Sequence, residues 1–135
     1  MTFGNSFNQP INGLPDSIIH LTFGDSFDQP VDKNNLPSSI LFLTFGYCFN
    51  QSVESLPNNL THLQLFLDYN QIIDNLPYTL KELVIWHKEN ILSRIMTFSD
   101  SDDDELMNYH NRKKNIKKIP FGCNVTHYSP RMSLI

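Results

Sequence analysis

The stretch LTFGDSFDQPV, residues 21–31, is the most informative part of this chain because it recurs. Residues 2–11 read TFGNSFNQPI, residues 43–53 read LTFGYCFNQSV, and residues 63–73 read LQLFLDYNQII, a looser copy. A Leu-Pro pair follows each copy, at positions 14–15, 36–37, 56–57 and 76–77. The spacings between equivalent leucines are 22, 20 and 20 residues (Leu21, Leu43, Leu63 and Leu83). Such a regular period indicates a repeat protein.

The period and the pattern Ile/Leu-x-x-Leu-x-Phe/Leu/Ile fall in the range of leucine-rich repeats. Leu21 and Phe23 are two residues apart, so an extended strand points both to one face and points the intervening residues to the other. The Leu-Pro pair disfavours a helix, because proline has no N–H and the residue before it avoids the α region. We therefore predict a β-rich, leucine-rich-repeat-like solenoid of about four coils, each giving one short strand to a parallel sheet.

A glycine follows the expected strand in three of the copies, at positions 4, 24 and 46. Because glycine tolerates a positive φ, we predict that it ends each strand in that conformation. The fourth copy has Phe66 at this position instead.

The sequences FNQPI (7–11), FDQPV (27–31) and FNQSV (49–53), each followed by Leu-Pro, resemble the FNIP repeat, which is named for its Phe-Asn-Ile-Pro signature and is related to leucine-rich repeats. The resemblance covers residues 1–87, and YNQII (69–73) fits less well. The family is abundant in amoebae and in the large DNA viruses that infect them. The resemblance implies a protein-interaction surface without catalytic residues. Many members carry an F-box that would make them substrate receptors of a ubiquitin ligase, but this sequence starts within the first repeat, so we expect no F-box in it.

Charge divides the chain into two parts. Residues 1–87 carry eight acids and two bases, whereas residues 88–135 carry six acids and eight bases. We therefore predict a repeat domain over 1–87 and an irregular C-terminal segment over 88–135. The repeats are expected at about 1–21, 22–43, 44–63 and 64–83. In the C-terminal segment we expect a short amphipathic helix over 88–98, an acidic run over 99–105, a basic run over 112–118, and a degenerate half-repeat over 119–128 that docks as a cap.

Composition excludes several classes of protein. The 135 residues are 40% hydrophobic and 18% charged, and the net charge of −4 is not that of a nucleic-acid-binding domain. No apolar run approaches the ~20 residues of a membrane-spanning helix, and the N-terminus lacks the features of a signal peptide. Cys48 and Cys123 are expected to stay free in such a chain. We expect an intracellular, cytoplasmic protein that contacts neither membranes nor nucleic acid.

The outward strand positions form two columns across the predicted sheet. One contains His20, Phe42, His62 and Glu82, and its neighbour contains Thr22, Thr44, Gln64 and Val84. Solenoids bind partners through faces of this kind, so these eight residues are the candidate partner-binding face. The alternative is an ordinary strand face without a partner. His20 and His62 lie two repeats apart, roughly 9–10 Å, which is too far for both to bind one zinc ion.

Another column contains Asn8, Asp28, Asn50 and Asn70. Repeated short polar side chains can hydrogen-bond the backbone of the next coil, so we predict a structural ladder rather than catalytic carboxylates. No catalytic motif, phosphate-binding loop or metal-ligand spacing is visible, so we expect no enzymatic activity, no metal and no cofactor.

The sequence thus predicts a non-enzymatic protein-protein interaction module. Two alternatives stay open. One is a structural protein that associates with itself through the unpaired edge of its first strand. The other is a remnant of a longer F-box/FNIP ubiquitin-ligase adaptor.

Overall fold

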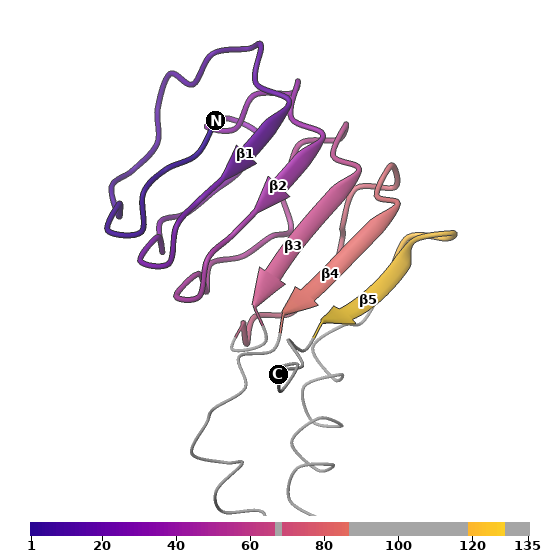
Figure 1. The fold of residues 1–135 in the computed structure, drawn as a ribbon. Helices are drawn as coiled ribbons and strands as arrows, with labels where there is room; N and C mark the ends of the chain where they lie inside the picture. The colour runs from indigo at the N-terminus through magenta and orange to yellow at the C-terminus, as the bar shows by residue number, and fades with distance from the viewer. Residues whose placement is uncertain (67–68, 87–118, 129–135) are drawn as a thin grey trace, which may run out of the picture.

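The computed structural model describes residues 1–66, 69–86 and 119–128, and within them the chain forms a stack of coils with one parallel β-sheet (Figure 1). The strands are β1 (His20–Thr22), β2 (Phe42–Thr44), β3 (His62–Phe66), β4 (Glu82–Trp86) and β5 (Asn124–Tyr128). They lie in the order β1-β2-β3-β4-β5, and each neighbouring pair is parallel. These described parts of the chain contain no helix. The predicted leucine-rich-repeat-like solenoid is therefore confirmed.

The register of the sheet places equivalent repeat positions side by side. Leu21 lies opposite Leu43, which lies opposite Leu63, and Leu63 in turn lies opposite Leu83. A tight turn at the Leu-Pro pair precedes each of these strands. In the last of them, the N–H of Leu80 donates to the carbonyl of the proline three residues earlier, at 3.0 Å. The repeated Leu-Pro pair therefore starts the turn that leads each coil into its strand.

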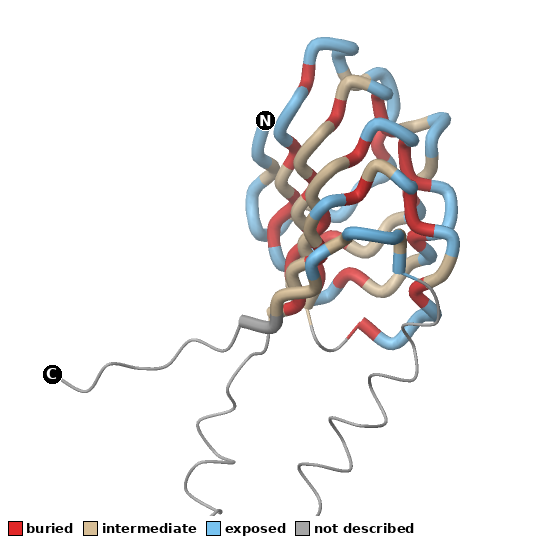
Figure 2. The backbone as a smooth tube through the Cα atoms, turned by 90° about the vertical axis from the view of Figure 1, so that its right-hand side faces the viewer, coloured by how far each residue is buried: buried red, intermediate tan, exposed pale blue. Residues whose placement is uncertain are grey.

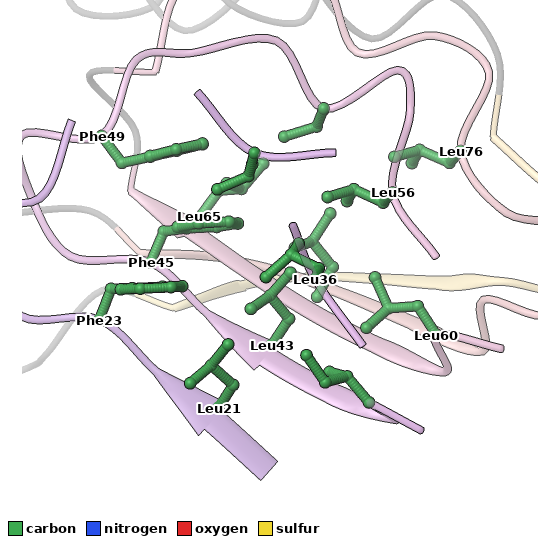
Figure 3. Packing of buried hydrophobic residues seen from close by; sticks show 14 of the residues in the cluster. Leu21, Phe23, Leu36, Leu43, Phe45, Phe49, Leu56, Leu60, Leu65 and Leu76 are labelled. Atoms are coloured by element: carbon green, nitrogen blue, oxygen red, sulfur yellow. The ribbon is translucent and has the colours of Figure 1, made fainter. Parts of the chain in front are cut away.

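The interior is built from the inward positions of the strands and from two columns of aromatic rings. Buried stretches recur along successive coils (Figure 2), and the rings of Phe23 and Phe45 lie parallel, one above the other (Figure 3). The first ring column contains Phe3, Phe23 and Phe45, and the second contains Phe7, Phe27, Phe49 and Tyr69. Rings within one coil also stack, with centroids 3.9 Å apart for Phe23 and Phe27.

The structure shows that the role predicted for the repeated glycines is wrong. Neither Gly24 nor Gly46 has a positive φ; among the glycines this occurs at Gly13 and Gly122. A Cβ on Gly24 would lie 2.5 Å from the carbonyl oxygen of Gly4, and one on Gly46 would lie 2.5 Å from the carbonyl carbon of Gly24. Glycine is needed because the backbones of successive coils touch at this point.

The strand of the fourth copy, which has Phe66 in place of the glycine, and the strand after it are longer than the first two. β1 and β2 have three residues each, whereas β3 and β4 have five and pair as far as Phe66 opposite Trp86. A side chain does not fit the close approach that the glycines allow. The strands therefore continue for two more residues at this position.

Residues 119–128 contribute the fifth strand of the sheet. β5 pairs with β4 over five residues, with Asn124 opposite Glu82. Cys123 and Val125 pack against the hydrophobic core. This strand occupies the place where the half-repeat was expected to dock. The helix predicted over 88–98 and the charged runs over 99–105 and 112–118 lie outside the described residues.

At the other end of the sheet, residues 1–3 cover the outer edge of β1. The amine of Met1 donates to the carbonyl of His20 at 2.7 Å, and Thr22 N–H donates to the carbonyl of Met1 at 3.0 Å. Phe3 N–H donates to the carbonyl of Thr22 at 2.9 Å. In a parallel ladder alternate residues bond to the same neighbour, so the backbone groups of Thr2 point away from β1. Among the described residues, the outermost backbone on this side of the sheet is therefore that of Thr2 rather than that of β1.

Candidate partner-binding face

The four residues of the first outward column lie together on one face of the sheet. The ring centroids of His20 and Phe42 are 4.2 Å apart with planes inclined by 8°, and those of Phe42 and His62 are 4.3 Å apart with planes inclined by 18°. His62 Nε2 lies 3.8 Å from Glu82 Oε2. Paired strands lie about 4.8 Å apart, which brings side chains at equivalent positions into contact. The result is a continuous row of three stacked rings ending in a carboxylate, and β5 extends it by Asn124.

Thr61 fixes the orientation of the His62 ring. Its hydroxyl donates to the carbonyl of Leu41 at 2.9 Å, and the same oxygen lies 2.8 Å from His62 Nδ1. Because the hydroxyl hydrogen is already donated to Leu41, we assign Nδ1 as the donor in the second contact. The other ring nitrogen, Nε2, lies on the side of Glu82. The residue before β3 thus holds His62 parallel to Phe42.

Thr61, His62 and Glu82 have the residue types of a hydroxyl–imidazole–carboxylate triad but not its chemistry. In such a triad the imidazole accepts the hydroxyl proton, whereas here the hydroxyl donates to a backbone carbonyl. The 3.8 Å between His62 and Glu82 exceeds hydrogen-bond distance. In the described ranges no cluster of His, Cys, Asp and Glu could hold a metal ion. Thr61, His62 and Glu82 therefore lack the hydrogen bonds of a catalytic triad.

The second outward column lies beside the first. Thr22 is opposite Thr44, and Gln64 is opposite Val84. These side chains are half-buried and offer hydroxyl, amide and methyl groups. On β5, Thr126 continues the column. The outward positions of β1 to β4 include no lysine or arginine, and Glu82 is the carboxylate among them.

Two aromatic residues of this region were not among the candidate face residues predicted from the sequence. Tyr47 and Phe66 meet edge to face, with ring centroids 6.2 Å apart and planes inclined by 79°. Phe66 lies at the end of β3, where the other copies have glycine. The replacement of that glycine by a large ring was the signal that could have drawn attention to this end of the strand.

The column of Asn8, Asp28, Asn50 and Asn70 forms a chain of hydrogen bonds from coil to coil. The side-chain oxygens of Asn8, Asp28 and Asn50 each accept from the backbone N–H of the equivalent residue in the next coil. The distances are 3.0 Å from Asp28 N to Asn8 Oδ1, 2.9 Å from Asn50 N to Asp28 Oδ1 and 3.0 Å from Asn70 N to Asn50 Oδ1. Gln51 Nε2 also donates to Asp28 Oδ1, at 2.9 Å. Asp28 therefore holds two coils together in the same way as the asparagines on either side of it.

Replacing Asp28 by alanine is expected to lower the free energy of unfolding by about 1–3 kcal/mol, because the half-buried N–H of Asn50 loses its acceptor. Asp28→Asn keeps the accepting oxygen and is expected to change stability by less than about 0.5 kcal/mol. Urea denaturation of the two variants and of the parent chain measures both values. A loss of the same size in both variants would contradict this role for Asp28.

The remaining reactive groups do not point to chemistry on this face. Cys48 and Cys123 are free, and burial raises the pKa of the Cys123 thiol, which opposes formation of the reactive thiolate. Burial also raises the pKa of Tyr69, whose hydroxyl donates to the carbonyl of Gln51 at 2.9 Å. Tyr69 thus adds a hydrogen bond to the ring column of the core.

Comparison with known proteins agrees with this repeat geometry. The family model described as FNIP Repeat matches residues 7–48 and 49–85, which is more than half of the chain. The chain belongs to the FNIP repeat family. Its sheet and its repeated Phe-Asn/Asp-Gln segments are thus features of a repeat fold that is typical of protein interaction and generally non-enzymatic.

A solved structure is also similar to this FNIP protein. It is that of CroV588, described as a novel circular LRR protein, with 33% sequence identity and a TM-score of 0.63. The similarity covers 95% of this chain, which spans 17% of the length of that protein. No curated protein matches the sequence. Among the described residues, no helix has the length and apolar character needed to cross a membrane.

Proposed function

We propose that this FNIP protein is a protein-protein interaction module that binds its partner through the outward face of the parallel sheet. The observation that carries the proposal is the stacked row of His20, Phe42 and His62, which ends at Glu82. The inward positions of the same strands already supply the hydrophobic core. The outward rings are therefore available for contact with another molecule.

The chemistry of the face supports recognition of a protein surface. The ring row is flat and pre-ordered, because stacking and the contact with Thr61 restrict its side chains. Binding to ordered aromatic side chains costs little additional side-chain entropy, and such residues are frequent in the centres of interfaces. The neighbouring column adds the hydroxyls of Thr22 and Thr44 and the amide of Gln64. These groups can donate and accept hydrogen bonds along an extended segment of a partner.

Replacing Phe42 and His62 together by alanine is expected to reduce partner binding by at least about tenfold, because it removes the two central rings of the row. Affinity purification from the native cell identifies the partner, and binding of the purified partner to parent and variant chains then gives the change. Both substitutions lie on the outward side of the sheet, so circular dichroism is expected to show a folded variant.

Tyr78→Ala provides a matched control. Tyr78 is 82% exposed and lies in the turn after Pro77, outside the two columns. Its replacement removes an exposed ring without changing the face, so binding should stay as in the parent chain. Undiminished binding by a folded double variant would show that the partner uses another surface.

A further inference from the structure

We propose that the face also recognises a second copy of this chain, and that two copies pair face to face about a two-fold axis that runs parallel to the strands between β2 and β3. This inference rests on the proposed function, because it uses the same face and names one molecule that binds to it. It follows from the order of side chains along the two outward columns.

A two-fold axis parallel to the strands gives the second copy the reverse order of strands. Each residue of the second copy stays at the same height along its strand. β1 of one copy then faces β4 of the other, and β2 faces β3. In the first column, His20 comes to lie opposite Glu82 of the second copy, and Phe42 comes to lie opposite His62 of the second copy. The column therefore complements itself when its order is reversed, as a two-fold interface requires.

The ends of the column show the complementarity in charge and hydrogen bonding. Within the part of the chain that the structure describes, His20 is exposed and its ring nitrogens have no hydrogen-bond partner. Glu82 Oε2 lies 3.8 Å from His62 Nε2, which is beyond hydrogen-bond distance. An imidazole N–H of one copy can donate to the carboxylate of the other copy at both ends of the interface. No lysine or arginine among the outward residues of these strands opposes this arrangement.

The second column fits the same arrangement. Reversal of the strand order places Thr44 opposite Gln64 of the second copy, where a hydroxyl and an amide can form a hydrogen bond. It places Thr22 opposite Val84 of the second copy, where methyl groups meet. A shift of the axis by half a strand spacing, onto β3, would instead place Glu82 against the ring of Phe42 of the second copy and leave the carboxylate without a donor. The chemistry of the columns therefore favours the axis between β2 and β3 over an axis on β3.

The size of the face predicts weak association. Four strands about 4.8 Å apart, with three to five residues each, present a few hundred Å² per copy. Stable interfaces bury about 800 Å² per partner. We therefore expect a dimer with a Kd on the order of 0.1–1 mM, which a larger partner of the same face could displace.

Complementary charge variants test the proposal. His20→Glu places two carboxylates opposite each other at both ends of the interface, and Glu82→Lys places an ammonium group opposite His20 at both ends. Each variant alone should associate at least about tenfold more weakly than the parent chain. An equimolar mixture of the two should recover association to within about threefold of the parent, because the introduced glutamate then faces the introduced lysine. Sedimentation equilibrium of the full chain up to about 1 mM measures the Kd of the parent chain and sets a lower limit on the Kd of each single variant.

Recovery in the mixture cannot arise within one chain. Positions 20 and 82 are three strand spacings apart, roughly 14 Å, and the two substitutions are carried by different molecules. Asp16→Lys is the control, since it makes the same charge change as Glu82→Lys at an exposed residue in the turn before β1. It should leave association unchanged. Circular dichroism checks that all variants are folded.

A parent chain that stays monomeric over the whole concentration range would overturn the inference. So would a dimer that tolerates both charge variants, which would place the interface elsewhere, for example at the edge formed by Thr2. Failure of the mixture to associate would also overturn it. The proposed function would survive each of these outcomes if the Phe42 and His62 double variant failed to bind a partner other than a second copy of this chain. The two proposals can therefore fail separately.

Discussion

Gly46→Ala is expected to lower the free energy of unfolding by about 2–4 kcal/mol, a large effect for the addition of one methyl group. The new Cβ would lie 2.5 Å from the carbonyl carbon of Gly24 and 2.7 Å from Cα of Asp25, and would also clash with the carbonyl oxygen of Gly24. All of these are backbone atoms, so no side chain can rotate away. The coils would have to separate, which would strain the hydrogen bond from Cys48 N–H to the carbonyl of Asp25, at 2.9 Å.

Gly4→Ala is the matched control, because Gly4 is the equivalent residue of the first coil and a Cβ there would meet nothing within 4 Å. We expect a change of no more than about 0.5 kcal/mol, or a slight gain from the reduced freedom of the unfolded chain. Chemical denaturation of both variants gives the comparison. Equal losses at the two positions would mean that glycine is required for its own backbone conformation and not for the contact between coils.

The period of the sequence was sufficient to predict the solenoid and its parallel sheet. Leu21 and its equivalents recur at the same place in each copy, and the alternation on either side of them defines an inward and an outward face. Because one coil cannot bury its own apolar residues, a fixed period leads to stacking of the coils. The looser fourth copy still fits, because the ring column needs only a flat side chain at each level and Tyr69 provides one.

The contacts that depend on distances between coils could not be predicted in this way. The sequence marks Gly24 and Gly46 as special, but either a positive φ or a close approach explains a glycine, and coordinates are needed to distinguish them. The docking of residues 119–128 was expected, but their register, with Asn124 opposite Glu82, depends on pairing with β4 across a long intervening stretch of sequence, which periodicity does not describe.

For the candidate face, the sequence predicted which residues belong to each column but not how they interact. The stacking of His20 on Phe42 depends on the register of β1 and β2, with equivalent residues directly opposite. The contact of Thr61 with His62 depends on the backbone turn at the start of β3, where Thr61 N–H and His62 N–H both donate to the carbonyl of Leu41 at 2.9 Å. A repeat pattern carries no information about such a local arrangement.

Phe27→Ala is expected to have the largest effect on stability of any single substitution in the core, about 3–5 kcal/mol. The side chain is fully buried, and its ring also stacks on the neighbouring ring column: its centroid is 3.9 Å from that of Phe23 in its own coil. It also stacks between Phe7 and Phe49, at 6.0 and 6.2 Å, in the coils on either side. Its removal would leave a cavity that three coils share, and a loss of this size is a large part of the roughly 5–15 kcal/mol that stabilises a typical domain.

Phe7→Ala tests whether the loss of stability depends on how deeply the ring is buried or only on its belonging to the ring column. Phe7 belongs to the same column but lies in the first coil and is only half-buried, so its truncation should cost about 1–2 kcal/mol. Urea denaturation followed by circular dichroism gives both values, and the intermediate variant Phe27→Leu should lie between them because it fills part of the cavity. In a stack of coils each unit is stabilised by its neighbours on both sides, so the central ring must matter more than the terminal one. If Phe27→Ala and Phe7→Ala cost the same, the stacking of rings between coils would not be what holds this solenoid together.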